Sequence, residues 1–149
     1  MAVHTSWRCG GRAAFFFEPR NLEDLAIFLA SFKEKKEIFL VGLGSNLLVR
    51  DKGFDGVIIS TAKFLNKIRW EQEFSELNVE CGVPCAKIAR ESVKKNMKGL
   101  EFFVGIPGTV GGALKMNAGA HGKDTWQYIK SVDVISREGK IETLQRNSF

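Results

Sequence analysis

Two glycine-rich segments contain the residue types in this sequence that suit binding of an anionic or flat ligand. The first, Gly42-Leu43-Gly44-Ser45-Asn46, directly follows the apolar run of residues 38–41. Two glycines, a serine and an asparagine at the end of a buried strand can turn backbone N–H groups toward an anion. The same residues also suit a tight hairpin turn, and the spacing alone does not decide between these interpretations.

This first segment is not a dinucleotide-binding fingerprint of the Rossmann type. That fingerprint requires a glycine at position 47 and a helix directly afterwards. Position 47 is leucine, and the run Leu47-Leu48-Val49 predicts a strand. We therefore exclude a Rossmann fold.

The second segment, residues 105–114, is long, apolar and dense in glycine. It is not a P-loop, because no Lys-Ser/Thr pair follows a glycine at the required place. Surface loops are usually polar, so we interpret the segment as backbone packed closely against a flat or phosphorylated ligand. A short helix starting near Pro107 would also direct free N–H groups toward an anion. The alternative is a glycine-mediated crossing of backbone segments in a core.

Residues 116–122 continue this segment. The side chain of Asn117 offers a donor and an acceptor to the edge of a heterocycle, but a bond within a local turn explains it equally well. His121 is a candidate catalytic residue, because histidine is the side chain type that can exchange a proton near neutral pH, although a histidine between two glycines is more often an ordinary loop residue.

Other kinds of site find little support. The two histidines and three cysteines have no paired zinc-ligand spacing, and no Gly-x-Ser-x-Gly motif occurs. The cysteine pattern indicates reduced thiols in a cytoplasmic protein. The net charge of +5 suits an anionic small molecule as well as nucleic acid. Because most phenylalanines occupy apolar strand or helix positions, we expect no nucleic-acid partner, and the apolar runs are too short to span a membrane.

A chain of 149 residues supports one modest domain or two small lobes. The first half predicts a β-α-β-β lobe: a strand at 13–17, a helix capped by Asn21, and strands at 38–41 and 57–59. Lys33, Lys35 and Lys36 are expected at the end of that helix, where cations are favoured.

The second half predicts a second α+β lobe. It comprises a hairpin of residues 67–70 and 77–81, a helix with Pro84 in its first turn, and a final hairpin turning at Glu138-Gly139. On the helix, Glu91 is expected to pair with Lys95. The predicted fold class is therefore α+β, with lobes at 1–63 and 64–149.

Three ordered blocks resemble the UDP-N-acetylenolpyruvoylglucosamine reductase family, flavoenzymes that make UDP-N-acetylmuramate for peptidoglycan. This family lies within the vanillyl-alcohol-oxidase-type FAD-binding class. The resemblance covers essentially the whole chain, and the third block is the most specific. The blocks are Thr5-Ser6-Trp7-Arg8-Cys9-Gly10-Gly11, Val41-Gly42-Leu43-Gly44-Ser45-Asn46-Leu47-Leu48-Val49, and Gly99-Leu100-Glu101 through Ile106-Pro107-Gly108-Thr109-Val110-Gly111-Gly112 to Met116-Asn117-Ala118-Gly119-Ala120.

The resemblance implies that FAD lies between the two lobes. The first glycine segment would hold the pyrophosphate, the second would approach the flavin and ribityl chain, and the residues after it would complete that wall. The implied cofactor-binding residues are Gly42, Leu43, Gly44, Ser45, Asn46 and Leu47, then Ile106, Pro107, Gly108, Gly111, Gly112 and Ala113, and finally Met116, Asn117, Ala118 and Gly119.

The resemblance also implies a reaction in which NADPH is the reductant and a UDP-sugar is the small-molecule substrate. The family's catalytic Arg, Ser and Glu have no matching positions in this sequence, so we expect no catalytic residue in this chain, no metal, and no reductase activity of these residues alone. His121 stands where some members have a tyrosine and receives no role. A monomer in the cytoplasm is expected. The alternatives are the FAD domain of another oxidase or dehydrogenase of the same class, and a standalone anion-binding or nucleic-acid module.

Overall fold

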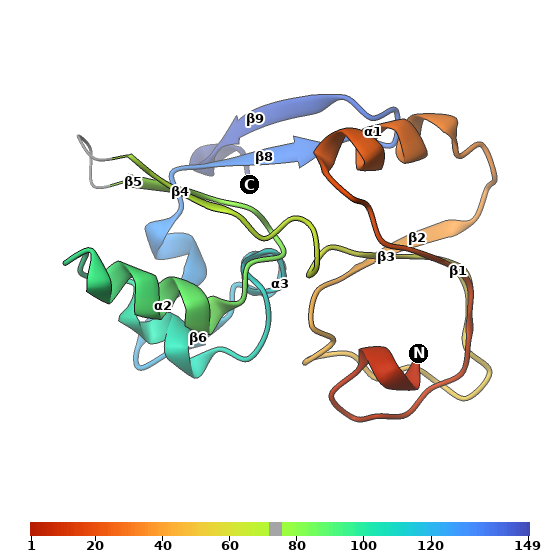
Figure 1. The fold of residues 1–149 in the computed structure, drawn as a ribbon, viewed down its shortest axis with the longest axis horizontal. Coiled ribbons are helices and arrows are strands. Elements are labelled where there is room, and N and C mark those ends of the chain that lie inside the picture. Colours follow the sequence, from red (N-terminus) through yellow and green to blue (C-terminus); the bar gives the residue numbers. More distant parts are fainter. Residues whose placement is uncertain (72–75) are drawn as a thin grey trace.

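A three-stranded parallel sheet forms the centre of the first lobe in the computed structural model, which describes residues 1–71 and 76–149 (Figure 1). The strand order is β1-β3-β2, and both outer strands run parallel to β3. The middle strand carries Val57, Ile58 and Ile59, which are almost fully buried, as expected of a parallel strand covered on both faces. The bounds are β1 (Ala13–Phe17), β2 (Glu37–Val41) and β3 (Phe54–Ser60).

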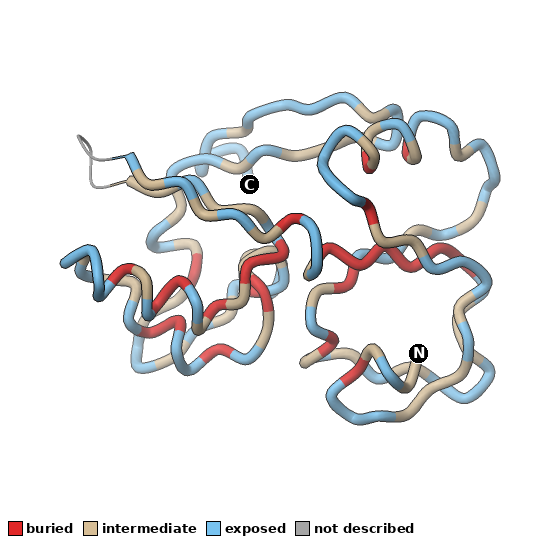
Figure 2. Tube along the Cα trace, viewed as in Figure 1, coloured by how far each residue is buried: buried red, intermediate tan, exposed pale blue. Residues whose placement is uncertain are grey.

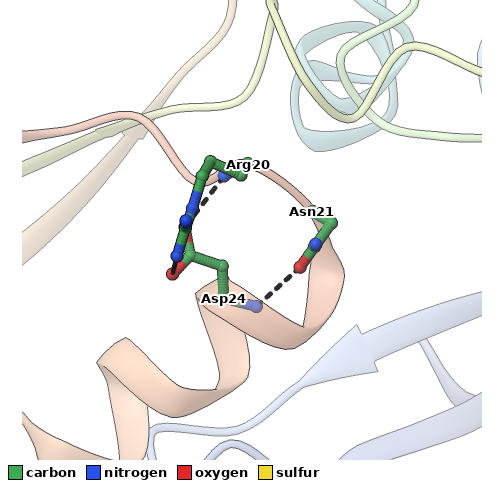
Figure 3. Close-up of polar contacts among 3 residues, drawn as sticks. All are labelled: Arg20, Asn21 and Asp24. Carbon is green, nitrogen blue, oxygen red and sulfur yellow. Dashed lines mark hydrogen bonds and ion pairs between the residues drawn. The ribbon is translucent and has the colours of Figure 1, made fainter.

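Helix α1 (Leu22–Ser31) covers one face of this sheet. Its Leu25 and Leu29 pack in one cluster with Val57 and Ile59. The helix begins as predicted, because Asn21 Oδ1 accepts a hydrogen bond of 2.8 Å from the Asp24 N–H (Figure 3). Such a cap satisfies one of the N–H groups that have no partner within the helix.

Two expectations for the first lobe are wrong. The helix ends at Ser31 with Phe32 as its C-cap, so the three lysines lie beyond it, and Lys36 pairs instead with Asp55 on β3. Residues 47–49 form no strand. Their apolar pattern fitted a strand, but Gly11 and Gly53 donate N–H bonds to the Arg50 carbonyl and hold the loop in an irregular path.

The second lobe is built around α2 (Cys85–Lys94), η2 (Glu101–Gly105) and α3 (Val110–Met116). Ile88 of α2 and Phe102 and Phe103 of η2 form the centre of its buried cluster. Figure 2 shows buried residues concentrated here and along β3, with exposed chain around both. Pro84 is the N-cap of α2, one residue before the predicted first turn.

Both hairpins of the second half are present. The predicted turn of the first hairpin falls largely on residues 72–75, which lie outside the described residues. The second hairpin turns with Gly139 at φ +78° and returns to the first lobe, where Ile135 packs against the α1 cluster. The hairpins are β4 (Ile68–Glu71) with β5 (Glu76–Val79), and β8 (Ser131–Ile135) with β9 (Ile141–Gln145).

Two details of the second lobe differ from the expectations. Glu91 pairs with Lys94 at 2.8 Å, three residues on, rather than with Lys95. Lys95 is the C-cap of α2, and its backbone no longer has helical dihedral angles. Helix α3 starts at Val110, not near Pro107, because Thr109 caps it.

The remaining elements are short, and no helix among the described residues has the length and apolar character to cross a bilayer. They are η1 (Ala2–His4), β6 (Gly119–Ala120), β7 (Lys123–Asp124), η3 (Thr125–Tyr128) and η4 (Arg146–Ser148).

Candidate functional site

A cleft of about 680 Å³ opens at the carboxyl end of the parallel sheet. Parallel strands end at one edge, which is where open α/β sheets bind their ligands. Glu18 follows β1, Gly42 follows β2, and Ser60 is the last residue of β3; all three line the cleft. Its volume lies within the range of small-molecule sites.

The loop that follows β2 presents free backbone donors beside this cleft. No backbone carbonyl among the described residues accepts a hydrogen bond from the N–H groups of residues 42–46. Gly42 and Leu43 line the cleft directly, and Gly44 adopts φ +67°, a conformation that favours glycine. A loop with several unsatisfied N–H groups is chemically suited to an anion, as one of the two interpretations of this segment predicted.

The two glycine segments contact each other. Ser45 Oγ donates a hydrogen bond of 2.7 Å to the Pro107 carbonyl, across 62 positions of sequence. A Cβ placed on Gly42 would lie 2.3 Å from Thr109 Oγ1, and one on Gly108 would lie 2.9 Å from Ser45 Oγ. The loop after β2 and the start of the second segment therefore form one continuous surface.

The expected anion site at the helix of the second segment is not present. The first N–H groups of α3 already have protein partners: Val110 donates to Val83 O at 2.9 Å and Gly111 to Cys81 O at 2.8 Å. Gly112 N–H reaches the capping hydroxyl of Thr109 at 3.4 Å. Among the described residues, the N–H groups without a protein acceptor include those of residues 42–46 and, just before α3, those of Gly108 and Thr109.

Close backbone packing, the alternative explanation for the second segment, accounts for several of its glycines. A Cβ on Gly111 would lie 2.7 Å from the Cys81 Cβ, and one on Gly119 would lie 2.5 Å from the Lys123 carbonyl. Gly112 differs: it is exposed, and a Cβ there would have only Thr109 Oγ1 nearby, at 3.6 Å. Of the two glycines of α3, Gly112 is the one whose position could hold a Cβ without a clash with protein atoms.

The side chains of the predicted site residues face different surroundings. Ile106 and Ala113 are buried in the core of the second lobe, so only their backbone atoms remain to border a ligand. Leu43 and Met116 are exposed, and Leu47 is half-buried.

Asn117 bonds within the protein at the end of α3, as the local-turn interpretation of this residue predicts. This residue is the C-cap in the left-handed region, at φ +43°, and its Oδ1 accepts a 3.1 Å bond from the Trp126 N–H. The Ala118 carbonyl accepts from the Thr125 hydroxyl at 2.7 Å. Residues 116–118 thus hold η3 in place, and β6, which begins at Gly119, contacts η2. His121 is exposed at φ +53°.

Three charged residues of the cleft were not predicted from the sequence. Glu18 and Lys63 form an ion pair of 3.0 Å, and Arg8 lines the wall beside Gly42 and Leu43. Glu18 and Lys63 follow β1 and β3 within a few residues, so recognition of the strands as parallel would have indicated them.

The cysteines near the second segment are unsuited to nucleophilic chemistry. Burial raises the pKa of the Cys85 thiol to about 11 and also raises the pKa of Cys81. Both thiols are therefore protonated at neutral pH, whereas the thiolate is the reactive form. Within the described residues no group of histidine, cysteine and acidic side chains is arranged to hold a metal ion.

Comparison with known proteins gives a consistent picture. The FAD binding domain family matches residues 13–145 of this chain. A protein of Nitrosomonas eutropha named UDP-N-acetylenolpyruvoylglucosamine reductase is 46% identical over 95% of this chain. A protein of the same name from Legionella pneumophila is 45% identical over the whole chain.

A solved structure has the same fold. The crystal structure of UDP-N-acetylenolpyruvylglucosamine reductase from Thermus caldophilus superposes with a TM-score of 0.77 at 26% identity, covering 99% of this chain and 51% of that one. The chain likewise covers 43% and 48% of the two relatives above, so it spans about half of their length.

Proposed function

Because the chain belongs to the FAD binding domain family, we propose that it is the FAD-binding portion of a reductase that converts UDP-N-acetylglucosamine enolpyruvate to UDP-N-acetylmuramate for peptidoglycan. The identity of about 45% to relatives named for this activity supports the assignment of the reaction. The fold of the Thermus caldophilus enzyme supports it independently. In this proposal NADPH is the reductant, and the protein works as a monomer in the cytoplasm.

The continuous surface made by the two glycine segments carries the proposal. The unpaired N–H groups of residues 42–46 fit the anionic pyrophosphate of FAD, because backbone donors at the end of a strand bind phosphate oxygens well. The cleft beside them has room for the adenosine half. The exposed Gly112, where a Cβ would have only Thr109 Oγ1 nearby, leaves room for a flat ring.

When bound, FAD supplies a ring system that accepts a hydride from NADPH and passes it to the enolpyruvyl carbon. The residues of this chain bind and orient the cofactor for that chemistry. The N–H groups of residues 42–46 hold its negative charge, and the Ser45–Pro107 hydrogen bond fixes the spacing between the two binding segments. The boundary of the two lobes near residue 63 is part of this proposal, with the cofactor bridging them.

Titration of the purified 149-residue chain with FAD tests the binding role. We expect saturable binding that quenches flavin fluorescence, and a yellow protein that releases FAD on denaturation. Gly108→Val is a matched disruption, because its side chain would meet Ser45 Oγ and strain a backbone at φ +136°. A well-folded wild-type chain that does not retain FAD contradicts the proposal.

A chimera tests the reaction. This chain would replace the aligned half of the Legionella pneumophila relative, to which it is 45% identical. We expect NADPH oxidation that depends on the enolpyruvyl substrate. A chimera that binds FAD but reduces only other acceptors would instead support another oxidase or dehydrogenase of the same class.

A further inference from the structure

The turn formed by residues 5–9 is fixed against the glycine loop after β2. The Ser6 N–H donates to the Gly44 carbonyl at 3.1 Å, and a Cβ on Gly44 would lie only 2.0 Å from the His4 carbonyl. Thr5 is buried and closes the turn, since its Oγ1 donates to Cys9 O at 3.2 Å and its carbonyl accepts from Arg8 N–H at 3.1 Å. The backbone of Arg8 therefore has a defined position relative to residues 42–46.

The side chain of Arg8 is exposed on the cleft wall that also contains Gly42 and Leu43. No carboxylate among the residues that the structure describes forms an ion pair with it, whereas the other cation of the cleft, Lys63, is held by Glu18. A guanidinium has five N–H donors in a planar arrangement that matches two phosphate oxygens. Arg8 is thus the free cation beside a row of free backbone N–H groups.

The backbone of Arg8 is in a costly conformation. Its φ is +52°, in the left-handed region that residues other than glycine seldom adopt. Glycine would fit this position with less strain, so the fold does not require a long cationic side chain here. The backbone conformation therefore does not explain why this residue is an arginine, and we look for the explanation in what its side chain binds.

We propose that Arg8 binds the diphosphate of FAD, opposite the backbone donors of residues 42–46. The inference rests on the proposed function, since it assumes that the cofactor occupies this cleft. Diphosphate esters also occur in NADPH and in the UDP-sugar, so the shared chemistry is that of a nucleoside diphosphate. The position of Arg8 at the carboxyl end of the parallel sheet, beside Gly42, favours the FAD diphosphate.

Two substitutions separate binding from folding. Arg8→Gln removes the charge, and Arg8→Gly removes the side chain while relieving the left-handed backbone. We expect each to weaken the binding of FAD and of ADP by about 10- to 100-fold, the loss typical of a charge-assisted hydrogen bond. The melting temperature of Arg8→Gly without ligand should equal or exceed that of the wild type. Arg90→Gln, on the exposed face of α2, is the charge-matched control and should leave both affinities unchanged.

Calorimetric titration of the 149-residue chain with FAD, ADP, UDP and NADP⁺ decides the outcome. Loss of FAD and ADP affinity in both Arg8 variants, with Arg8→Gly at least as stable as the wild type, supports the inference. Wild-type affinity for FAD and ADP in either variant overturns it, and so does an effect confined to UDP or NADP⁺. A wild-type chain that binds neither FAD nor ADP overturns the proposed function itself, whereas a wild-type chain that binds FAD independently of Arg8 leaves that function standing.

Discussion

Ser45 Oγ donates a 2.7 Å hydrogen bond to the carbonyl of Pro107 and thereby joins two loops that lie 62 residues apart in the chain. One partner lies in the loop after β2 and the other lies just before α3. The contact fixes the distance between a segment with free backbone donors and a segment with an exposed glycine face. A cofactor that spans both segments therefore meets a surface that is already assembled.

Replacing Ser45 with alanine removes this link. We expect a loss of about 1 kcal/mol in the free energy of unfolding, because the bond is single and partly exposed, and a weaker affinity for FAD. Ser31→Ala is the matched control, since Ser31 Oγ donates a 3.0 Å bond to the Phe28 carbonyl on α1, far from the cleft. FAD titration and urea melts would measure both effects. Equal FAD affinities in the two variants contradict the proposed role of the contact.

Replacing Gly112 with alanine should change the stability of the chain and its affinity for FAD in opposite directions. Alanine is favoured over glycine within a helix by about 0.5–1 kcal/mol, and the nearest atom to its Cβ would be 3.6 Å away, an ordinary contact. We expect a higher melting temperature of the ligand-free chain but weaker FAD binding, because the methyl group would occupy the surface proposed for the flavin. If the stabilised variant binds FAD as the wild type does, the flavin does not lie against this face.

Replacing Gly42 with alanine tests the packing between the loops. The new Cβ would lie 2.3 Å from Thr109 Oγ1 and 2.9 Å from its Cγ2, and Thr109 is buried. We expect destabilisation of about 1–3 kcal/mol, the usual cost of overpacking. Thr109→Ala removes both of those atoms, so Gly42→Ala should cost distinctly less in that background. Additive effects in this double-mutant cycle, measured by urea melts, would show that the two residues do not constrain each other.

Local patterns predicted most of the elements. The Asn21 cap, the helix that follows Pro84 and the turn at Gly139 each depend on neighbours in sequence, and each is present. The strand expected at residues 47–49 failed because its apolar pattern is a local property. One of the two hydrogen bonds that hold that loop comes from Gly11, far away in the chain.

The candidate site was predicted only in part. Glycine clustering indicated both segments, but the sequence gives no means to see that Val83 and Cys81 already satisfy the start of α3. Likewise, Arg8 joins the cleft only because the strands are parallel and the N-terminal turn folds over Gly44. Such features depend on tertiary pairing, which periodicity and spacing do not encode.

Replacing Asn21 with alanine tests the start of α1. Its side chain accepts the Asp24 N–H at 2.8 Å, while Arg20 bonds to the Asp24 carboxylate and lowers its pKa (Figure 3). We expect a loss of about 1 kcal/mol for Asn21→Ala and almost none for Asn21→Ser, which keeps a capping oxygen. Chemical denaturation would measure both, and equal losses in the two variants would show that the cap contributes nothing.

Burial of Cys85 predicts loss of stability in alkali. Its pKa is raised to about 11 by burial, against about 9 in the unfolded chain, so the folded state holds its proton more tightly. A group of this kind stabilises the fold fully below the unfolded pKa, and that stability is lost as the pH rises from about 9 to about 11. A difference of about two pKa units corresponds to about 3 kcal/mol.

Cys85→Ala isolates this effect, because alanine cannot ionise. At pH 7 the variant should be less stable than the wild type, since truncation leaves a small cavity in the core. Between pH 8 and 11 the wild type should lose stability faster, so the two melting temperatures should converge. Every other side chain is the same in the two proteins, so its contribution cancels in the comparison. Parallel curves over this range would show that the Cys85 thiol does not govern the alkaline transition.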